Sequence, residues 1–348
     1  MNSIRNLILT TAITAMFAPT LQAGHPVAPA PKDGKSVAPV REWFPDEPLS
    51  FITVGTLFSD KLTGVSVDSI TGIWSPQQRD AFLFLDSRYH YEDNGQFINS
   101  TGLGFRKLSP CKNFIFGVNA FWDSIHSEQN NDFDQLGLGA EVLSKWVDFR
   151  FNYYLPENDQ VLVDRKSAHR SKRTAGAGFV STTKTTDHFE RLEVALEGFN
   201  AEIGVNLPVC KHTEIRLFGG YYHYDNPFGG DFNGFKARLE ARLLRGVIAN
   251  VEYWDDAYLM GGHWTASVSA SVPFSIYNLV TGRNPFEGAA ESFKTGQRDF
   301  KSRLGEMVER SHRIQTVTSG YIPTGSTRST QTTYFQDEPS PGGGPIIE

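Results

Sequence analysis

The sequence predicts an all-β protein: a transmembrane antiparallel up-and-down β-barrel of about 12 strands, with a C-terminal helix in the pore. Three observations lead to this fold class. Apolar and polar residues alternate with period two over most of residues 49–274, which is typical of strands. Charged residues recur on one face of these strands, and short connections alternate with long ones, as in membrane barrels.

The alternation is clearest between Leu103 and Pro156. Within this stretch an apolar face opposes a face that carries charges, at Asp123, Glu141, Asp148 and Arg150. A membrane barrel places its apolar face in lipid and its polar face around the lumen. A soluble sandwich alternates in the same way, with its apolar face toward a core, so this stretch by itself leaves both folds open.

The later strands favour the barrel. Residues 233–243 carry four successive charges on one face and apolar side chains on the other. Four such charges would be hard to bury in a soluble core, whereas water in a lumen keeps them solvated. We therefore expect a set of charged residues to line the lumen: Asp123, Glu141, Asp148, Arg150, Glu202, Arg238, Glu240 and Arg242.

Composition narrows the class of function. The chain has 348 residues, 39% of them hydrophobic, and its net charge of −6 gives no reason to expect a nucleic acid partner. We expect no cofactor and no metal site, because no histidine spacing indicates one. Asp123, Ser124 and His126 are close in sequence, but neighbours on a strand point to opposite faces, so we expect no enzyme.

Two segments precede the strands. Arg5, the apolar run LILTTAITAMFA and a small residue at Ala23 predict a secretory signal peptide over residues 1–23. A membrane anchor is the alternative, but the apolar run is too short for one. Residues 24–48 are rich in Pro and Ala and lack periodicity, and we interpret them as an extended periplasmic linker.

The predicted barrel occupies residues 49–274. Its strands are expected at residues 50–58, 62–74, 80–91, 97–108, 114–125, 134–144, 147–155, 190–207, 213–224, 233–243, 247–256 and 263–274. Connections after even-numbered strands are short, such as 145–146, whereas 156–189 is a long loop. Short turns are periplasmic in bacterial barrels, so we expect the N-terminus in the periplasm.

After Phe274 the period of the pattern changes. Asn284 and Pro285 supply an N-cap and a first helical proline, and apolar residues then follow at helical spacing. These features predict a linker over residues 275–314 that contains a helix over about 285–311. Residues 315–348 are rich in Thr, Ser, Pro and Gly, and we expect them to be disordered.

Several of these segments resemble one family. The runs LGFRKL, FGVNAFWDS, LGLGAEVLS and DFRFNYYLP, with GFNAEIGVNLP and RLGEMVERSHRI, resemble the β-barrel domain of inverse autotransporters, the intimin and invasin family. The resemblance implies an integral barrel in outer-membrane lipid, inserted by the barrel-assembly machinery during biogenesis. It also implies a C-terminal linker that re-enters the pore and leads a passenger, often an adhesin, to the cell surface by type V secretion.

The length of the C-terminal part qualifies this expectation. Only 34 residues follow Ile314, whereas one immunoglobulin-like passenger domain needs about 100 residues. We therefore expect a translocator that anchors, and exports, a short C-terminal segment whose surface ligand is unknown. A porin-like channel without export is the alternative, and a separate chain could supply a passenger.

Barrel dimensions leave room for one helix in the lumen. Strands about 4.8 Å apart and tilted by about 40° give a 12-stranded barrel a backbone radius of about 12 Å, and one helix is about 10–12 Å across. The predicted pore helix would then direct its cations toward inward acids such as Glu141, Glu202 and Glu240. These pore-helix residues are Arg298, Arg303 and Arg310.

Two further features have alternative interpretations. Cys111 and Cys210 fall in short turns four strands apart, about 20 Å, too far for a disulfide unless the turns fold inward. The sequence DRKSAHRSKR at 164–173, in the predicted loop, is either a patch for lipopolysaccharide or another polyanionic ligand, or a solvated loop.

Overall fold

The computed structural model describes residues 50–60, 63–76, 78–157, 160–208, 213–256, 261–296, 298–311 and 313–335. The predicted signal peptide, the predicted linker 24–48, Cys210 and the residues after 335 lie outside the described residues. Among the residues described, no helix is both long and apolar enough to cross a membrane.

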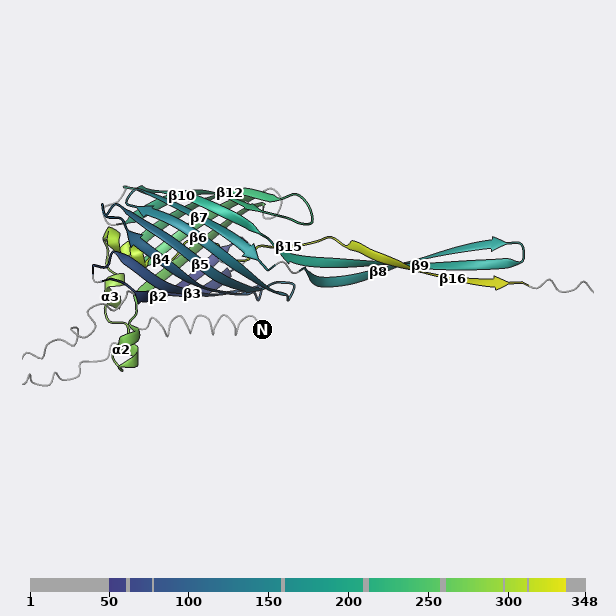
Figure 1. Ribbon diagram of the computed structural model, residues 1–348, viewed down its shortest axis with the longest axis horizontal. Helices are drawn as coiled ribbons and strands as arrows, with labels where there is room; N and C mark the ends of the chain where they lie inside the picture. Colours follow the sequence, from purple (N-terminus) through teal and green to yellow (C-terminus); the bar gives the residue numbers. More distant parts are fainter. Residues whose placement is uncertain are drawn as a thin grey trace, which may run out of the picture. The chain divides into compact units, whose positions relative to one another are not determined.

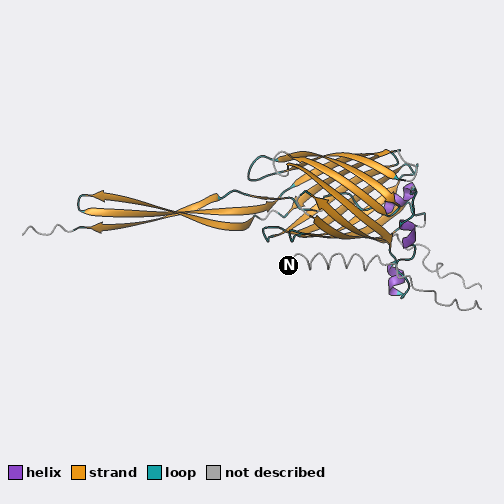
Figure 2. Cartoon of the chain, turned by 180° about the vertical axis from the view of Figure 1, so that it is seen from behind, coloured by secondary structure: helices purple, strands orange, loops and turns teal. Residues whose placement is uncertain are grey.

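Twelve of the described strands close an antiparallel barrel (Figure 1, Figure 2). In order around the barrel they are β1 (Phe51–Ser59), β14 (Gly261–Pro273), β13 (Val247–Asp256), β12 (Phe232–Leu244), β11 (Glu214–Tyr224), β10 (Gly198–Leu207), β7 (Val147–Pro156), β6 (Asp132–Ser144), β5 (Phe114–His126), β4 (Phe97–Leu108), β3 (Ala81–Glu92) and β2 (Thr63–Trp74). Because β1 pairs with both β14 and β2, the barrel has no open edge. The predicted all-β barrel is confirmed.

The two faces of the barrel strands differ in chemistry as the period-two pattern predicts. On the outside, Phe116, Val118 and Phe235 keep 53%, 57% and 69% of their surface exposed, which only lipid can cover favourably. On the inside, Asp148 and Arg150 are only 3% and 5% exposed. The outward face is therefore an apolar belt, and the lumen holds the charges.

The two ends of the barrel differ in their connections. One end, here the turn end, carries the short connections after β4, β6, β10 and β12. The other, the hairpin end, carries β8 (Val161–Gly176) and β9 (Phe179–Ala195), which lie between β7 and β10 in the sequence. On its other edge β9 pairs with β15 (Thr316–Thr318) and β16 (Ile322–Tyr334). We call these four strands, labelled in Figure 1, the hairpin sheet.

The loop predicted over 156–189 is wrong, because β8 and β9 form a paired hairpin there. The predicted strand 190–207 is also divided, since β9 ends at Ala195 and β10 begins at Gly198. The first difference has a clear physical reason. The side chains of β8 are almost all exposed, so neither face needs apolar residues and the alternation that marks the barrel strands is missing.

The helix predicted over 285–311 is wrong. The chain instead forms α2 (Ile276–Val280), α3 (Ala289–Ser292), a short 3₁₀ turn, η2 (Phe300–Gly305), and then an extended segment. Gly288 and Gly296, with φ of 90° and 121°, interrupt any longer helix.

The tail expected to be disordered over 315–348 is wrong for the part that the structure describes up to β16. Residues 316–318 and 322–334 form β15 and β16. Thr-rich segments have high strand propensity but cannot form a sheet alone. The edge of β9 supplies the missing partner, and that partner is more than 100 residues away in sequence.

Candidate functional site in the barrel lumen

The C-terminal chain crosses the lumen from the turn end to the hairpin end. We call residues 298–311 and 313–315 the lumen segment. At the turn end Arg298 Nη2 lies 3.5 Å from Glu214 at the start of β11. At the hairpin end Arg313 Nη1 lies 3.4 Å from Glu92 at the end of β3. The chain then leaves the barrel into β15.

Two arginines of the lumen segment are clamped by barrel aspartates. Arg303 donates to both carboxylate oxygens of Asp148, over 2.9 and 2.7 Å, and to the Ser144 carbonyl. Arg310 donates to both oxygens of Asp123, over 2.7 and 2.5 Å. All four of these charged side chains are at most 5% exposed. Such two-point pairs fix both position and direction of the segment.

Glu306 is the acidic centre of the turn-end half. It accepts from Arg303 Nε over 3.1 Å and from Arg298, and it lies 3.6 Å from Arg216 and 3.7 Å from Arg242. Its side chain is 8% exposed. A carboxylate among four guanidinium groups offsets the repulsion of the arginines that line this side of the barrel.

The backbone of the lumen segment is satisfied by barrel side chains. Arg106 donates to the carbonyls of Leu304 and Glu306, and Arg88 donates to that of Val308 over 2.5 Å. Nearer the hairpin end, the Ser311 N–H donates to the Tyr154 hydroxyl over 2.9 Å. These contacts explain why residues 306–311, after η2, stay extended without a strand partner inside the barrel, because buried peptide groups need hydrogen bonds.

The lumen is not uniformly polar. Leu304 and Val308 pack into a cluster of luminal apolar side chains, with Met307 and Phe300 at its border. The barrel contributes Ile70, Phe82, Phe84, Leu108, Ile115, Phe121 and Leu143. This cluster gives the segment an apolar seat between its two charged clamps, which a water-filled pore would not need.

The structure brings the residues predicted from the sequence into one region. All eight expected lumen-lining residues are buried, as are Arg303 and Arg310. The expected pairings differ, however. Glu141 binds Arg106, and Glu202 binds Arg238 over 2.9 Å, so neither meets the lumen segment as expected. Glu240 lies within 4.0 Å of barrel arginines. These pairings depend on distances between strands, which the local sequence pattern does not contain.

Sequence reasoning missed several functional side chains. Arg88 and Arg106 donate hydrogen bonds to backbone carbonyls of the lumen segment, and Glu306 forms an ion pair with Arg303 of the same segment. A signal existed for the first two, because each follows the inward parity of its strand, two residues after Asp86 and Gly104. For Glu306 the only signal was its place in the motif RLGEMVERSHRI.

Gly137 makes room for the Arg310 clamp. A Cβ added at Gly137 would overlap the Arg310 guanidinium. We predict that Gly137→Val displaces Arg310 from Asp123 and lowers the free energy of unfolding by about 1–3 kcal/mol or more, as overpacking does. Urea-dependent loss of the folded gel band in detergent measures this. Gly219→Val is the matched control, because a Cβ at Gly219 on the lipid face meets nothing within 4 Å. Equal effects of the two substitutions would contradict this role for Gly137.

The lumen segment does not fill the barrel completely. A cavity of about 660 Å³ remains beside it, toward β1, β2, β13 and β14. Its barrel wall combines small polar residues, such as Thr53, Ser66 and Ser269, with charged residues, such as Arg88 and Glu240. The segment thus leaves part of the lumen open beside β1, β2, β13 and β14.

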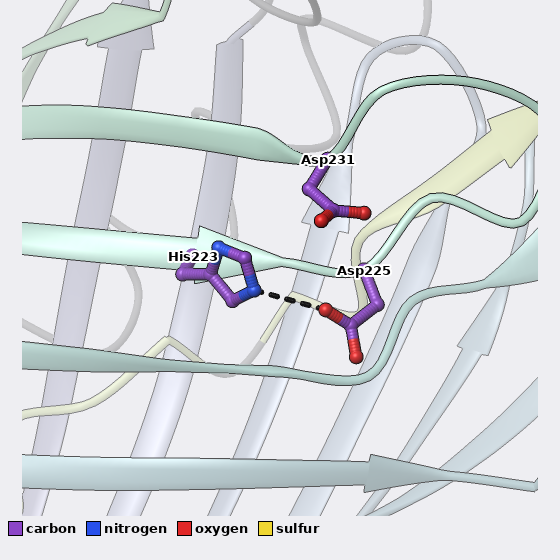
Figure 3. A group of neighbouring side chains, drawn as sticks. All are labelled: His223, Asp225 and Asp231. Atoms are coloured by element: carbon purple, nitrogen blue, oxygen red, sulfur yellow. Dashed lines mark hydrogen bonds and ion pairs between the residues drawn. The ribbon is translucent and has the colours of Figure 1, made fainter.

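One group at the hairpin end has the composition of a metal site. His223, Asp225 and Asp231 bring one ligand atom each within 4.8 Å of one another (Figure 3). However, His223 Nε2 already bonds Asp225 over 2.9 Å, and its Nδ1 bonds Asn233 over 2.6 Å. With both ring nitrogens engaged, this is a hydrogen-bonded loop anchor in the structure.

The geometry defines the class of this protein as a membrane-spanning β-barrel whose lumen holds a segment of its own chain. Residues 40–227, more than half of the chain, match the family model described as the inverse autotransporter beta-domain. The chain therefore belongs to the inverse autotransporter family. It is an outer-membrane barrel of the translocator type, with its apolar belt in membrane lipid.

One solved structure supports the fold. It is reported as "Unveiling the Mechanism Behind the in-meso Crystallization of Membrane Proteins" and aligns with a TM-score of 0.53 and 13% identity, over 78% of this chain and 100% of its own. Two others align more weakly. The beta domain of the Bordetella autotransporter BrkA gives a TM-score of 0.26 and 10% identity, over 64% and 98%. Acinetobacter baumannii Omp33 gives 0.36 and 10%, over 66% and 99%. No curated protein matches the chain.

Proposed function

We propose that this barrel exports its own C-terminal segment through the lumen and holds it there after export. The observation that supports this most directly is the pair of clamps, Arg303 with Asp148 and Arg310 with Asp123, which fix the segment along the pore. In this proposal the turn end is periplasmic and the hairpin end is outside the cell, as short turns and long connections are arranged in bacterial barrels.

We also propose specific partners for this barrel. A secreted precursor with a signal peptide over 1–23 would reach the periplasm and be inserted by the barrel-assembly machinery. A surface ligand would meet the hairpin sheet, whose β8 exposes Arg165, Lys166, Arg170, Lys172 and Arg173. A polyanion such as lipopolysaccharide fits that charge.

Export predicts that the end of β16 is accessible from outside the cell. Tyr334 is 76% exposed, so a cysteine there would be open to reagents. We expect Tyr334→Cys, in a Cys111→Ser, Cys210→Ser background, to react with a membrane-impermeant maleimide on intact cells. A segment retained in the periplasm would react only after permeabilisation.

Cys111 serves as the internal marker for this measurement. It is exposed in the turn after β4, and a hydrogen bond from Ser109 lowers the pKa of its thiol, so its reactive form is favoured. In a Cys210→Ser chain, Cys111 is expected to react only after permeabilisation. Labelling of Cys111 on intact cells, without labelling of the Tyr334→Cys variant, would reverse the orientation and contradict the proposal.

We propose no catalytic function for the rim of the barrel. Asp123 is bound by Arg310, Ser124 donates to Asp134 over 2.5 Å, and His126 bonds Asp132 over 2.7 Å. The three side chains thus have separate partners, whereas a nucleophile and its base must bond each other. A porin-like function keeps one supporting observation, the cavity of about 660 Å³ beside the lumen segment.

A further inference from the structure

We infer that the edge of β9 is a strand-acceptor site that binds residues 316–334 once they have left the pore. The inference rests on the proposed export and adds a role for the β8–β9 hairpin. The ligand it assigns is chemically specific: an extended, hydroxyl-rich peptide that adds a strand to a sheet edge.

The arrangement of the hairpin sheet gives β9 two different edges. One edge pairs with β8, its neighbour in sequence, from Val161 to Gly176. The other pairs with the C-terminal chain, first along β15 and then along β16 to its last residue, Tyr334. Without β15 and β16 this second edge of β9 would present unpaired peptide groups over most of its length, and such an edge is a template for an added strand.

Hydrogen bonds join the C-terminal chain to β9 near the end of that strand, at Leu192. The Ser319 N–H donates to the Leu192 carbonyl over 2.7 Å, and the Ser319 hydroxyl accepts from the Leu192 N–H over 2.8 Å. Tyr321 then donates to Asp164 of β8 over 2.6 Å, and this bond lowers the pKa of Asp164. These contacts engage the segment where it leaves the barrel, just ahead of β16 in the sequence.

Further contacts set the register along β16. His188 bonds the Thr327 hydroxyl over 2.9 Å, and the Thr183 and Thr330 hydroxyls lie 3.2 Å apart. At the far end the rings of Phe179 and Tyr334 pack with centroids 6.3 Å apart. Cross-strand Thr pairs and aromatic pairs are the contacts that select one register over its neighbours.

The chemistry of the segment suits both the passage and the acceptor. Between residues 315 and 335 Arg328 is the one Lys, Arg, Asp or Glu side chain. A chain of small hydroxyl side chains can pass a lumen lined with fixed charges without forming strong pairs there. The lumen segment, which precedes it in the sequence, carries the clamping arginines Arg303 and Arg310. The sequence therefore separates the residues suited to pass the lumen from the residues that bind its wall.

A disulfide pair tests the acceptor site in the full chain. In the Cys111→Ser, Cys210→Ser background, Thr183→Cys with Thr330→Cys places two thiols at facing positions of β9 and β16. Thr183→Cys with Ser329→Cys is the matched control, because Ser329 is adjacent but on the opposite face of the sheet. Non-reducing gels of intact cells measure bond formation.

We expect the facing pair to form roughly tenfold or more disulfide than the control pair, because bridging requires Cβ atoms that point toward each other. Equal bridging of both pairs, where the Tyr334→Cys variant is labelled from outside the cell, would overturn the acceptor site while leaving export intact. Absence of that outside label would instead overturn the proposed export, and the acceptor site with it.

Discussion

Replacing Asp148 with alanine is expected to lower the free energy of unfolding by roughly 3–5 kcal/mol, the usual loss when one member of a buried ion pair is removed. Asp148 accepts two bonds from Arg303 and one from the Ser144 N–H, and it lies 3.7 Å from both Arg150 and Arg216. Its removal therefore leaves three buried cations with less compensation. Urea titration of the purified barrel in detergent, followed by its heat-modifiable gel band, measures the loss.

A double-mutant cycle separates the energy of the Arg303–Asp148 pair from the other effects of removing Asp148. Replacing Arg303 with methionine as well removes the uncompensated cation, so the double variant is expected to be more stable than Asp148→Ala alone. The control is Asp187→Ala, whose partner Arg170 is 75% exposed in the hairpin sheet. A surface pair of that kind is worth about 0–1 kcal/mol. A loss at Asp148 no larger than at Asp187 would show that the lumen segment is not held by its clamps.

The barrel could be predicted from the sequence because the membrane imposes a local rule. Lipid on one side and a lumen on the other force alternate residues of every strand to differ, as Phe149 and Arg150 do. The identity of the charged residues followed from the same parity. Their partners did not, since whether Arg310 meets Asp123 or Glu202 depends on how far the segment has advanced through the pore.

The lumen segment shows why helical spacing misled. Phe300, Leu304 and Met307 fit a helix, but the helical turn η2 ends at Gly305 and the chain is extended from Glu306, with Val308 buried in the luminal apolar cluster. Arg88, Arg106 and Tyr154 favour the extended conformation, because their hydrogen bonds to the peptide groups of the segment replace those of a helix. In the same way, β16 became ordered because β9, distant in sequence, offers it an edge.

Deleting residues 298–348 is expected to convert the barrel into an open channel. The deletion removes both clamps and the apolar seat of Leu304 and Val308, so the cavity of about 660 Å³ would extend across the whole lumen. Its wall would expose the charges of Asp123, Asp148 and Glu202 to water, which solvates them without a plug. We expect a several-fold rise in single-channel conductance in planar bilayers over the full chain.

The control deletes residues 320–348, which removes β16 but keeps the lumen segment with Arg303 and Arg310 in place. This variant is expected to conduct like the full chain, because the constriction lies inside the barrel and not in the hairpin sheet. A porin-like function makes the opposite prediction: the full chain and both deletions conduct alike, since ions would already pass through the cavity beside Thr53 and Ser267. Equal conductance in all three would therefore decide for the channel and against a lumen closed by its own exported segment.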